Sequence, residues 1–248
     1  MKLLEQVEHR PWAIPERPWL LGQVWSKLLF AHWPIPAAEM QALIGPGLEL
    51  DTFEGQAWVG VVPFRMSELL FGGRVPPPFS SRFEELNVRT YVTLDGKPGV
   101  YFFSLDASNF AAVAAARSLY HLPYFNARMS VKLQGEQVYY SSQRVHPNAP
   151  RPAEFEGSYG PVGAIYRSLP GTLEHWLTER YCLYAVAGQG RVYRGEIHHQ
   201  PWPLQPAQAT FSKNTVALSH GIKLPDLAPV LHYAERLEVV AWSIRRVR

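Results

Sequence analysis

The sequence has a single cysteine and no long hydrophobic run. Because Cys182 has no second cysteine to pair with, the chain cannot form an internal disulfide. A membrane-spanning helix needs about 20 consecutive apolar residues, and the best local run, residues 110–116, is far shorter. The first residues also lack the apolar segment of a signal peptide. These absences predict a cytoplasmic protein that contacts no membrane.

Four familiar catalytic signatures are also missing. The sequence contains no G-x-G-x-x-G, G-x-x-x-x-G-K-[ST], G-x-S-x-G or H-E-x-x-H motif, which removes the main support for nucleotide binding, classical hydrolases and zinc proteases. His198 and His199 are adjacent in an extended segment, where neighbouring side chains point to opposite faces and cannot chelate one ion. The sequence therefore predicts no metal site and no cofactor.

The sequence also has no large excess of positive or negative charge. The chain has 24 Lys plus Arg residues against 21 Asp plus Glu residues, for a formal net charge of +3. The basic residues are scattered along the sequence, apart from Arg245, Arg246 and Arg248 at the C-terminus. Nucleic-acid-binding domains usually gather theirs on one face or along one helix, so the sequence predicts no nucleic-acid partner. Whether the chain forms a homo-oligomer stays open.

Proline and hydrophobic residues are abundant, and they point to a folded protein rich in strands. With 22 prolines in 248 residues and 47% hydrophobic residues, the chain is neither disordered nor a helical bundle. Residues 85–92 alternate with period two, and a turn at 95–99 leads into a second predicted strand at 100–105. We expect the loop of this hairpin to be longer than the tightest two-residue form. A further strand is predicted over residues 57–66, and a second hairpin over 127–142.

Three short helices are predicted between these strands. They cover residues 36–44, 110–121 and 172–181, where proline, glycine and capping residues mark the ends. Residues 19–33 fit both helical and extended spacing, and a strand is favoured after Gln23. The whole pattern predicts a mainly β (α+β) fold, an antiparallel barrel or sandwich with peripheral helices.

An acid, an amide, a guanidinium and a phenol share one face of the predicted strand over residues 85–92. In chain order they are Glu85, Asn87, Arg89 and Tyr91. Inside a barrel these groups would form the floor of a binding site. On the outside they would face water or pair with charges from other strands. The sequence leaves both interpretations open.

Other candidate residues also have two interpretations. His32 lies in an apolar run, where a buried neutral histidine bonded to a backbone carbonyl is favoured over a functional group. Arg117 and Tyr120 end the second predicted helix, where a cation either complements the helix dipole or binds a ligand. Arg180, near the end of the third helix, has the same two roles open to it. Cys182 has no evident base to activate it and is expected to be a small buried residue.

Several ordered motifs carry a resemblance to a known family. They are LLFAHWPI at 28–35, LNVRTYV at 86–92, AARSLYHLPY at 115–124 and HHQPWPLQPA at 198–207. In these motifs the chain resembles the bacterial YqjF-like family, a domain of unknown function, over nearly its whole length from about residue 17. That family is distantly similar in fold to acetoacetate decarboxylase. The resemblance therefore implies an antiparallel β barrel or cone with helices packed outside and a pocket inside.

The prolines and glycines collect in no linker between these motifs. We therefore expect a single domain over residues 1–248. The resemblance implies that this domain is acetoacetate-decarboxylase-like and that residues 1–16 form an N-terminal extension.

The chain departs from acetoacetate decarboxylase at the residues that carry out the chemistry of that enzyme. In that enzyme an adjacent pair of lysines follows a proline after a helix, and one of them forms a Schiff base with the substrate. Here Pro123 is followed by Tyr124 and Phe125. The chain is therefore not expected to be an acetoacetate decarboxylase. Lys132, the nearest lysine in sequence, is predicted to face solvent from a strand.

The sequence is compatible with three functions. The first is binding of a small carboxylate-bearing metabolite, an organic acid, in a barrel pocket without Schiff-base chemistry. Its predicted ligand-binding residues are Arg89, Asn87, Tyr91, Arg117, Tyr120, Tyr124 and Trp58. The second is a lysine-independent lyase or hydrolase that acts on a keto acid or related metabolite, with Glu85 or His32 as general acid or base. The third is a structural or interaction protein, which would show an exposed aromatic patch.

Overall fold

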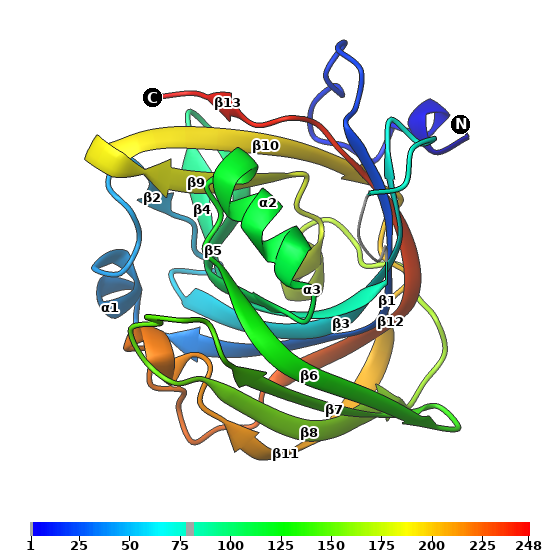
Figure 1. The fold of residues 1–248 in the computed structure, drawn as a ribbon, viewed down its shortest axis with the longest axis vertical. Coiled ribbons are helices and arrows are strands. Elements are labelled where there is room, and N and C mark those ends of the chain that lie inside the picture. The colour runs from blue at the N-terminus through cyan, green and yellow to red at the C-terminus, as the bar shows by residue number, and fades with distance from the viewer. Residues whose placement is uncertain (1, 78–81) are drawn as a thin grey trace.

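The computed structural model describes residues 2–77 and 82–248, and most of its regular structure is β-strand (Figure 1). The strands are β1 (Leu21–Ile35), β2 (Glu49–Leu50), β3 (Ala57–Phe71), β4 (Phe83–Leu94), β5 (Lys97–Ala107), β6 (Tyr124–Gln134), β7 (Gln137–Arg144), β8 (Glu154–Pro161), β9 (Cys182–Ala187), β10 (Arg191–His199), β11 (Gln205–Asn214), β12 (Val230–Ala241) and β13 (Arg245–Arg246). The helices are α1 (Ala37–Gln41), α2 (Phe110–Tyr120) and α3 (Leu173–Thr178), with 3₁₀ turns η1 (Lys2–Glu5), η2 (Gly188–Gly190) and η3 (Leu218–His220). The mainly β prediction is confirmed. Within the described residues, no helix is long and apolar enough to cross a membrane.

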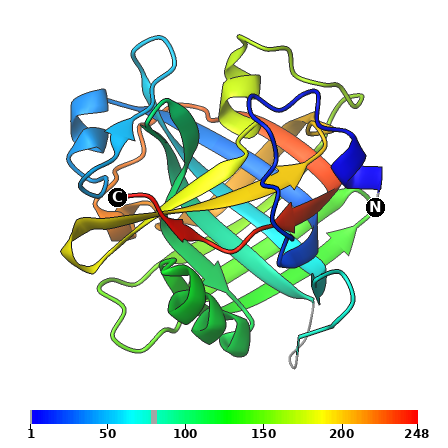
Figure 2. The ribbon, with the colours of Figure 1, turned by 90° about the horizontal axis from the view of Figure 1, so that it is seen from above.

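The strands form one sheet that curls into a cone-like ring (Figures 1 and 2). Their order is β13-β10-β9-β5-β6-β7-β8-β11-β12-β1-β3-β4-β2, and the additional pairings β10–β12 and β4–β5 join strands across this order. Neighbouring strands are antiparallel except where β5 runs parallel to β6 and to β9. Because the sheet curls, inward-facing side chains from strands far apart in the sequence meet in one interior.

The segment that fits both helical and extended spacing is a strand. β1 begins at Leu21, and residues 28–33 are buried without alternation, as in a strand covered on both faces. It pairs with β12 on one side and with β3 on the other, which outweighs its local helical spacing. The three predicted helices are present, although α1 and α3 end three residues before their predicted ends at 44 and 181.

The loop of the β4–β5 hairpin is shorter than the sequence predicts. Leu94 pairs directly with Lys97, so only Asp95 and Gly96 lie in the turn. Both have positive φ, 51° and 72°, which matches the twist that a two-residue hairpin turn imposes on its strands. The prediction of a longer loop was wrong because Lys97 and Pro98 continue the ladder instead of belonging to the turn.

Helix α2 lies at one open end of the ring (Figures 1 and 2). The side chain of Asn109 caps its first turn by accepting a hydrogen bond from the Ala112 amide at 3.0 Å. His121 ends the helix in the left-handed conformation, two residues before Pro123. Ala112 and Val113 are buried, so the helix is fixed against the ring just before the chain enters β6.

The N-terminal residues pack on the ring. Leu3 is buried beside Val240 and Trp242. Arg10 donates to the Ile197 carbonyl at 2.6 Å, which ties this segment to β10. The stretch that the sequence marks as an extension therefore contributes to the packing of β10 and β12.

Candidate functional site

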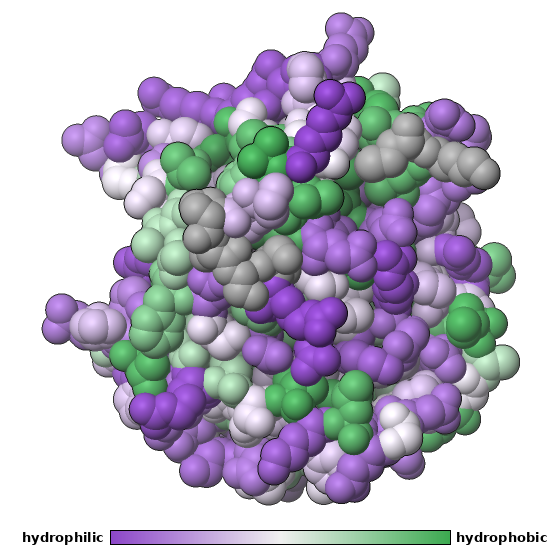
Figure 3. Space-filling model, turned by 45° about the vertical axis from the view of Figure 1, so that its right-hand side comes forward, coloured by the Kyte–Doolittle hydropathy of each residue, from purple (hydrophilic) through white to green (hydrophobic). Residues whose placement is uncertain are grey.

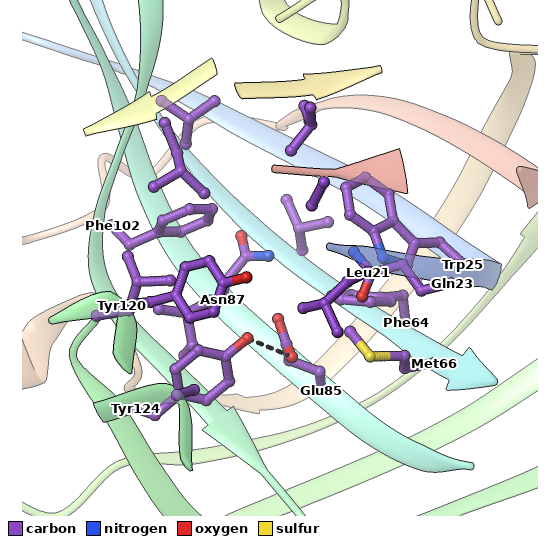
Figure 4. Close-up of a pocket in the computed structure, with 18 of the residues that line it drawn as sticks. Leu21, Gln23, Trp25, Phe64, Met66, Glu85, Asn87, Phe102, Tyr120 and Tyr124 are labelled. Carbon is purple, nitrogen blue, oxygen red and sulfur yellow. Dashed lines mark hydrogen bonds between the residues drawn. The ribbon is translucent and has the colours of Figure 1, made fainter. Parts of the chain in front are cut away.

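The ring encloses a cavity of about 190 Å³ beside α2 (Figure 4). Inward-facing side chains of β1, β3, β4 and β5 form about half of its lining. One face of α2 and residues from α3, β6, β9, β10, β12 and the loops form the rest. The polar residues in the lining are Gln23, Glu85, Asn87, Arg89, Tyr120, Tyr124, Thr178, Arg180, Cys182 and His199. The volume is below the roughly 300–1,000 Å³ of pockets for drug-sized ligands, so the cavity suits a small molecule.

The polar face of β4 points into this cavity. Glu85, Asn87 and Arg89 are all buried and all line it. Their neighbours on β3 are Phe64, Val62 and Gly60 respectively. Gly60 is needed beside Arg89 because a Cβ there would lie 2.9 Å from the His32 ring and 3.3 Å from Arg89 Cγ. The face that the sequence leaves undetermined is therefore interior.

Tyr91 is on the same face of β4, but it lies outside the cavity lining. Its ring packs against Trp176 of α3, with ring centroids 4.6 Å apart. Its hydroxyl donates to the Leu177 carbonyl at 2.8 Å and lies 2.6 Å from His32 Nε2. The expectation that Tyr91 forms a cavity wall is corrected, because α3 covers this end of the strand.

Glu85 and Tyr124 form a hydrogen-bonded pair at the cavity wall (Figure 4). The Tyr124 hydroxyl donates to the Glu85 carboxyl group at 3.0 Å. Burial is the main cause that raises the pKa of Glu85, to about 8, against the smaller opposing effect of this hydrogen bond. The Tyr140 hydroxyl donates to the Glu85 carbonyl at 2.9 Å and holds the strand in place. At neutral pH the carboxyl group is therefore mostly protonated and can donate a hydrogen bond.

Glu85 is expected to make stability depend on pH. Its pKa is about 8 in the folded protein against an ordinary value of 4.5, so between these values the folded state holds one more proton than the unfolded state. The contribution of Glu85 to the free energy of unfolding is full below pH 4.5 and falls by about 1.4 kcal/mol per pH unit up to about pH 8. Urea unfolding of the wild type and of Glu85→Gln at several pH values checks this. The same pH dependence in both proteins would contradict it.

Arg89 and Arg180 form a cationic end of the cavity. The Arg89 guanidinium lies 5.1 Å from the centre of the Phe30 ring and donates to the Leu177 carbonyl at 3.4 Å. Among the described residues no carboxylate pairs with it. Arg180 does have an acidic partner, because its Nη1 donates to Asp51 at 2.5 Å. Arg180 is therefore ion-paired through Nη1, whereas Arg89 has no acidic partner among the described residues.

Six buried polar atoms of lining residues have no hydrogen-bond partner. They are Trp25 Nε1, Asn87 Oδ1, Arg89 Nε, Tyr120 Oη, Arg180 Nη2 and Trp202 Nε1. All except the Asn87 oxygen can donate. Leaving a buried donor unpaired costs about 1–3 kcal/mol, and the lining presents five donors that the described residues leave unsatisfied.

Besides Tyr91, three of the predicted site residues lie outside the cavity lining. The Arg117 guanidinium donates to the Tyr124 carbonyl at 2.6 Å and lines a separate surface crevice, which agrees with a structural role at the helix end. Trp58 is buried in a cluster with Tyr91 and Leu177 and is not a wall of the cavity. His32 is fully buried, and burial lowers the pKa of its imidazole well below the ordinary value. The sequence favoured a backbone carbonyl as the partner of His32. The structure instead places the Tyr91 hydroxyl next to the imidazole.

Other lining residues are ones that the sequence did not single out. They include Gln23, Trp25, Thr178 and Trp202. Gln23 and Trp25 alternate on one face of β1, a signal that becomes readable only once the segment is known to be a strand. Cys182 lines the cavity, where burial raises the pKa of its thiol to about 12, so it is not a nucleophile at neutral pH.

Comparisons of sequence place the chain in a family. The family model DUF2071, described as "Uncharacterized conserved protein", matches residues 22–238. "Uncharacterized protein YqjF" from Bacillus subtilis (strain 168) is 42% identical over 244 residues, which cover 98% of this chain and 99% of that protein. The chain belongs to the DUF2071 family.

Solved structures show the fold of this DUF2071 chain. Acetoacetate decarboxylase from Legionella pneumophila subsp. pneumophila str. Philadelphia 1 matches with a TM-score of 0.62 and 12% identity, over 97% of this chain and 93% of that one. The enduracididine biosynthesis enzyme MppR, in a structure described as complexed with pyruvate, also matches with a TM-score of 0.62 and 12% identity, over 95% and 93% of the two chains. The acetoacetate-decarboxylase-like fold is thereby confirmed.

The position that the resemblance assigns to the decarboxylase lysines can now be placed in the DUF2071 chain. Tyr124 lines the cavity and Phe125 does not. Among the described residues no lysine lines the cavity, and Lys132 is exposed on β6, as predicted. At the position that the resemblance implies for the lysine pair, the DUF2071 chain thus has Tyr124, hydrogen-bonded to Glu85, and Phe125.

Proposed function

We propose that the protein binds a small carboxylate-bearing metabolite in the cavity, without Schiff-base chemistry. The observation that carries this proposal is Arg89, whose side chain is buried at the cavity with no acidic partner among the described residues. A buried unpaired guanidinium is costly unless an anion approaches it, and its planar fork matches a carboxylate.

The rest of the lining supports the same ligand. Tyr120 and Trp202 offer further unpaired donors, and the aromatic walls with few convergent polar groups are typical of small-molecule sites. A structural neighbour of the same fold is described as complexed with pyruvate, itself a small carboxylate.

Direct titration tests this proposal. Straight-chain and 2-oxo carboxylates are added to the full chain, and binding is followed by calorimetry and by tryptophan fluorescence, because Trp25 and Trp202 line the cavity. Saturable binding of at least one carboxylate, absent for the matching alcohol, is expected. Failure of every carboxylate to bind would overturn the proposal.

A second candidate function is a lysine-independent enzyme of the lyase or hydrolase type. The specific observation in its favour is Glu85, which is buried at the cavity with its pKa raised by that burial to about 8, so that it could act as a general acid on a bound keto acid. His32 cannot share this role, because it is outside the lining and bonded to Tyr91.

The Glu85→Gln variant separates catalysis from binding. The amide keeps the size of the side chain and can still accept from Tyr124, but it cannot transfer a proton. If the protein is an enzyme of this type, turnover is expected to fall by about 10²- to 10⁴-fold while ligand affinity changes little. Rate and affinity assays on the same preparation check this, and an equal loss of both would contradict the general-acid role.

The structural or interaction alternative has no comparable support. The exposed aromatic side chains among the described residues are Phe110 on α2 and Tyr139 on β7, which are on different elements. On the face shown in Figure 3, hydrophilic residues cover most of the surface and hydrophobic residues lie in several separate groups.

A further inference from the structure

The cavity changes from polar to apolar along β4. Arg89, Asn87, Glu85 and Phe83 are its successive lining residues on this strand. Phe83 is paired with Met66 on β3, so the lining beyond Glu85 is apolar on both strands. At about 3.3 Å per residue, Arg89 and Phe83 are roughly 20 Å apart along the strand. The cavity therefore has a cationic end and an apolar end.

Helix α2 covers the apolar end with alanines. Ala112, Ala115 and Ala116 line the cavity, whereas Ala111 and Ala114 are exposed on the other side of the helix. Alanine is the smallest good helix former, so the helix stays regular while its inner face leaves space. A larger apolar residue at these positions would fill that space, as side chains do in a close-packed core.

The other walls of the apolar end come from β1 and β3. They are Leu21, Met66, Leu69 and Phe71, and Gln23 on the same face of β1 adds one amide. Leu119, toward the C-terminal end of α2, also lines the cavity and is 63% exposed.

We propose that the ligand is an amphipathic monocarboxylate, with its carboxylate at Arg89 and an unbranched apolar tail against the alanine face of α2. This inference rests on the proposed function and specifies its ligand class. The polarity of the cavity carries it, because a short polar acid would leave the apolar end and the alanine face unfilled. Asn87 and Glu85 lie between the two ends and can bond a single polar group on the chain near the carboxylate.

A chain-length series tests the position of the tail. Butanoate, hexanoate, octanoate and decanoate are titrated into the full chain by calorimetry. Affinity is expected to rise by about fourfold for each methylene that enters the cavity, and to level off once the tail fills the cavity. A heat-capacity change that becomes more negative with chain length would mark apolar burial.

Two alanine variants on one helix supply the matched control. Ala115→Leu fills the apolar end and is expected to weaken decanoate binding by tenfold or more while changing butanoate binding by less than threefold. Ala114→Leu adds the same side chain on the exposed side and is expected to change neither. Melting curves of both variants confirm that the fold is retained. Ala116→Leu provides a second cavity-facing position if Ala115→Leu does not fold.

The outcomes distinguish the two proposals. If no carboxylate of any length binds, the proposed function itself fails. If short carboxylates bind but affinity does not rise with chain length, the proposed function stands and the amphipathic ligand is overturned. The amphipathic ligand is also overturned if the cavity-facing leucine variants weaken the binding of all chain lengths equally.

Discussion

Replacing Arg89 with glutamine is expected to reduce carboxylate affinity by at least thirtyfold. Truncating one partner of a buried charged pair costs about 2–5 kcal/mol, because the other charge is left buried without its counterpart. Arg89 is 9% exposed, and no described carboxylate could substitute for the ligand as its partner. Calorimetric titration with the tightest-binding carboxylate of the series gives the two dissociation constants to compare.

Two further variants show whether the effect is specific to this arginine. Arg89→Lys keeps the charge but lacks the planar fork, so an intermediate loss is expected. Arg117→Gln removes a guanidinium that lines a separate crevice, and it is expected to leave the affinity unchanged. If Arg117→Gln weakened binding as much as Arg89→Gln, the carboxylate would not be bound where we place it. Melting curves exclude loss of the fold, since Arg89 also contacts Phe30.

Replacing Arg144 with methionine is expected to lower the free energy of unfolding by about 3–5 kcal/mol. Arg144 on β7 donates through Nε and Nη2 to both carboxylate oxygens of Asp106 on β5, at 2.7 and 3.1 Å. Both side chains are almost completely buried. Removing the arginine would leave the Asp106 carboxylate buried without a partner. Urea unfolding of the variant and the wild type under the same conditions measures the loss.

A matched pair of exposed residues tests whether burial is the cause of this loss of stability. Arg236 bonds Glu238 at 2.8 Å, and both side chains are about half exposed. Arg236→Met is expected to cost no more than about 1 kcal/mol, because water screens and solvates such a pair. The double variant Asp106→Leu with Arg144→Met should recover part of the loss, since neither charge is then left unpaired. A loss below about 1 kcal/mol for Arg144→Met would contradict the expectation.

The sequence alone determined several of the strands and which of their side chains share a face. Period-two alternation over residues 85–92 put Glu85, Asn87 and Arg89 on one side of β4, and all three line the cavity. Turn and capping residues placed the two hairpins and α2, although the loop of the first hairpin is shorter than predicted. These features depend on neighbours a few residues apart, so local sequence specifies them. The absence of the decarboxylase lysine pair at Tyr124 and Phe125 was also readable directly.

Only the tertiary structure decided which face is interior and which residues meet there. Alternation distinguishes two faces of a strand but does not say which one the curled sheet encloses. Arg180 and Asp51 are 129 residues apart in the sequence, yet they pair at the cavity. The structure also separated Arg89 from Arg117, because α2 directs the latter to another crevice. Contacts of this kind arise when the ring of strands closes, and no local pattern encodes them.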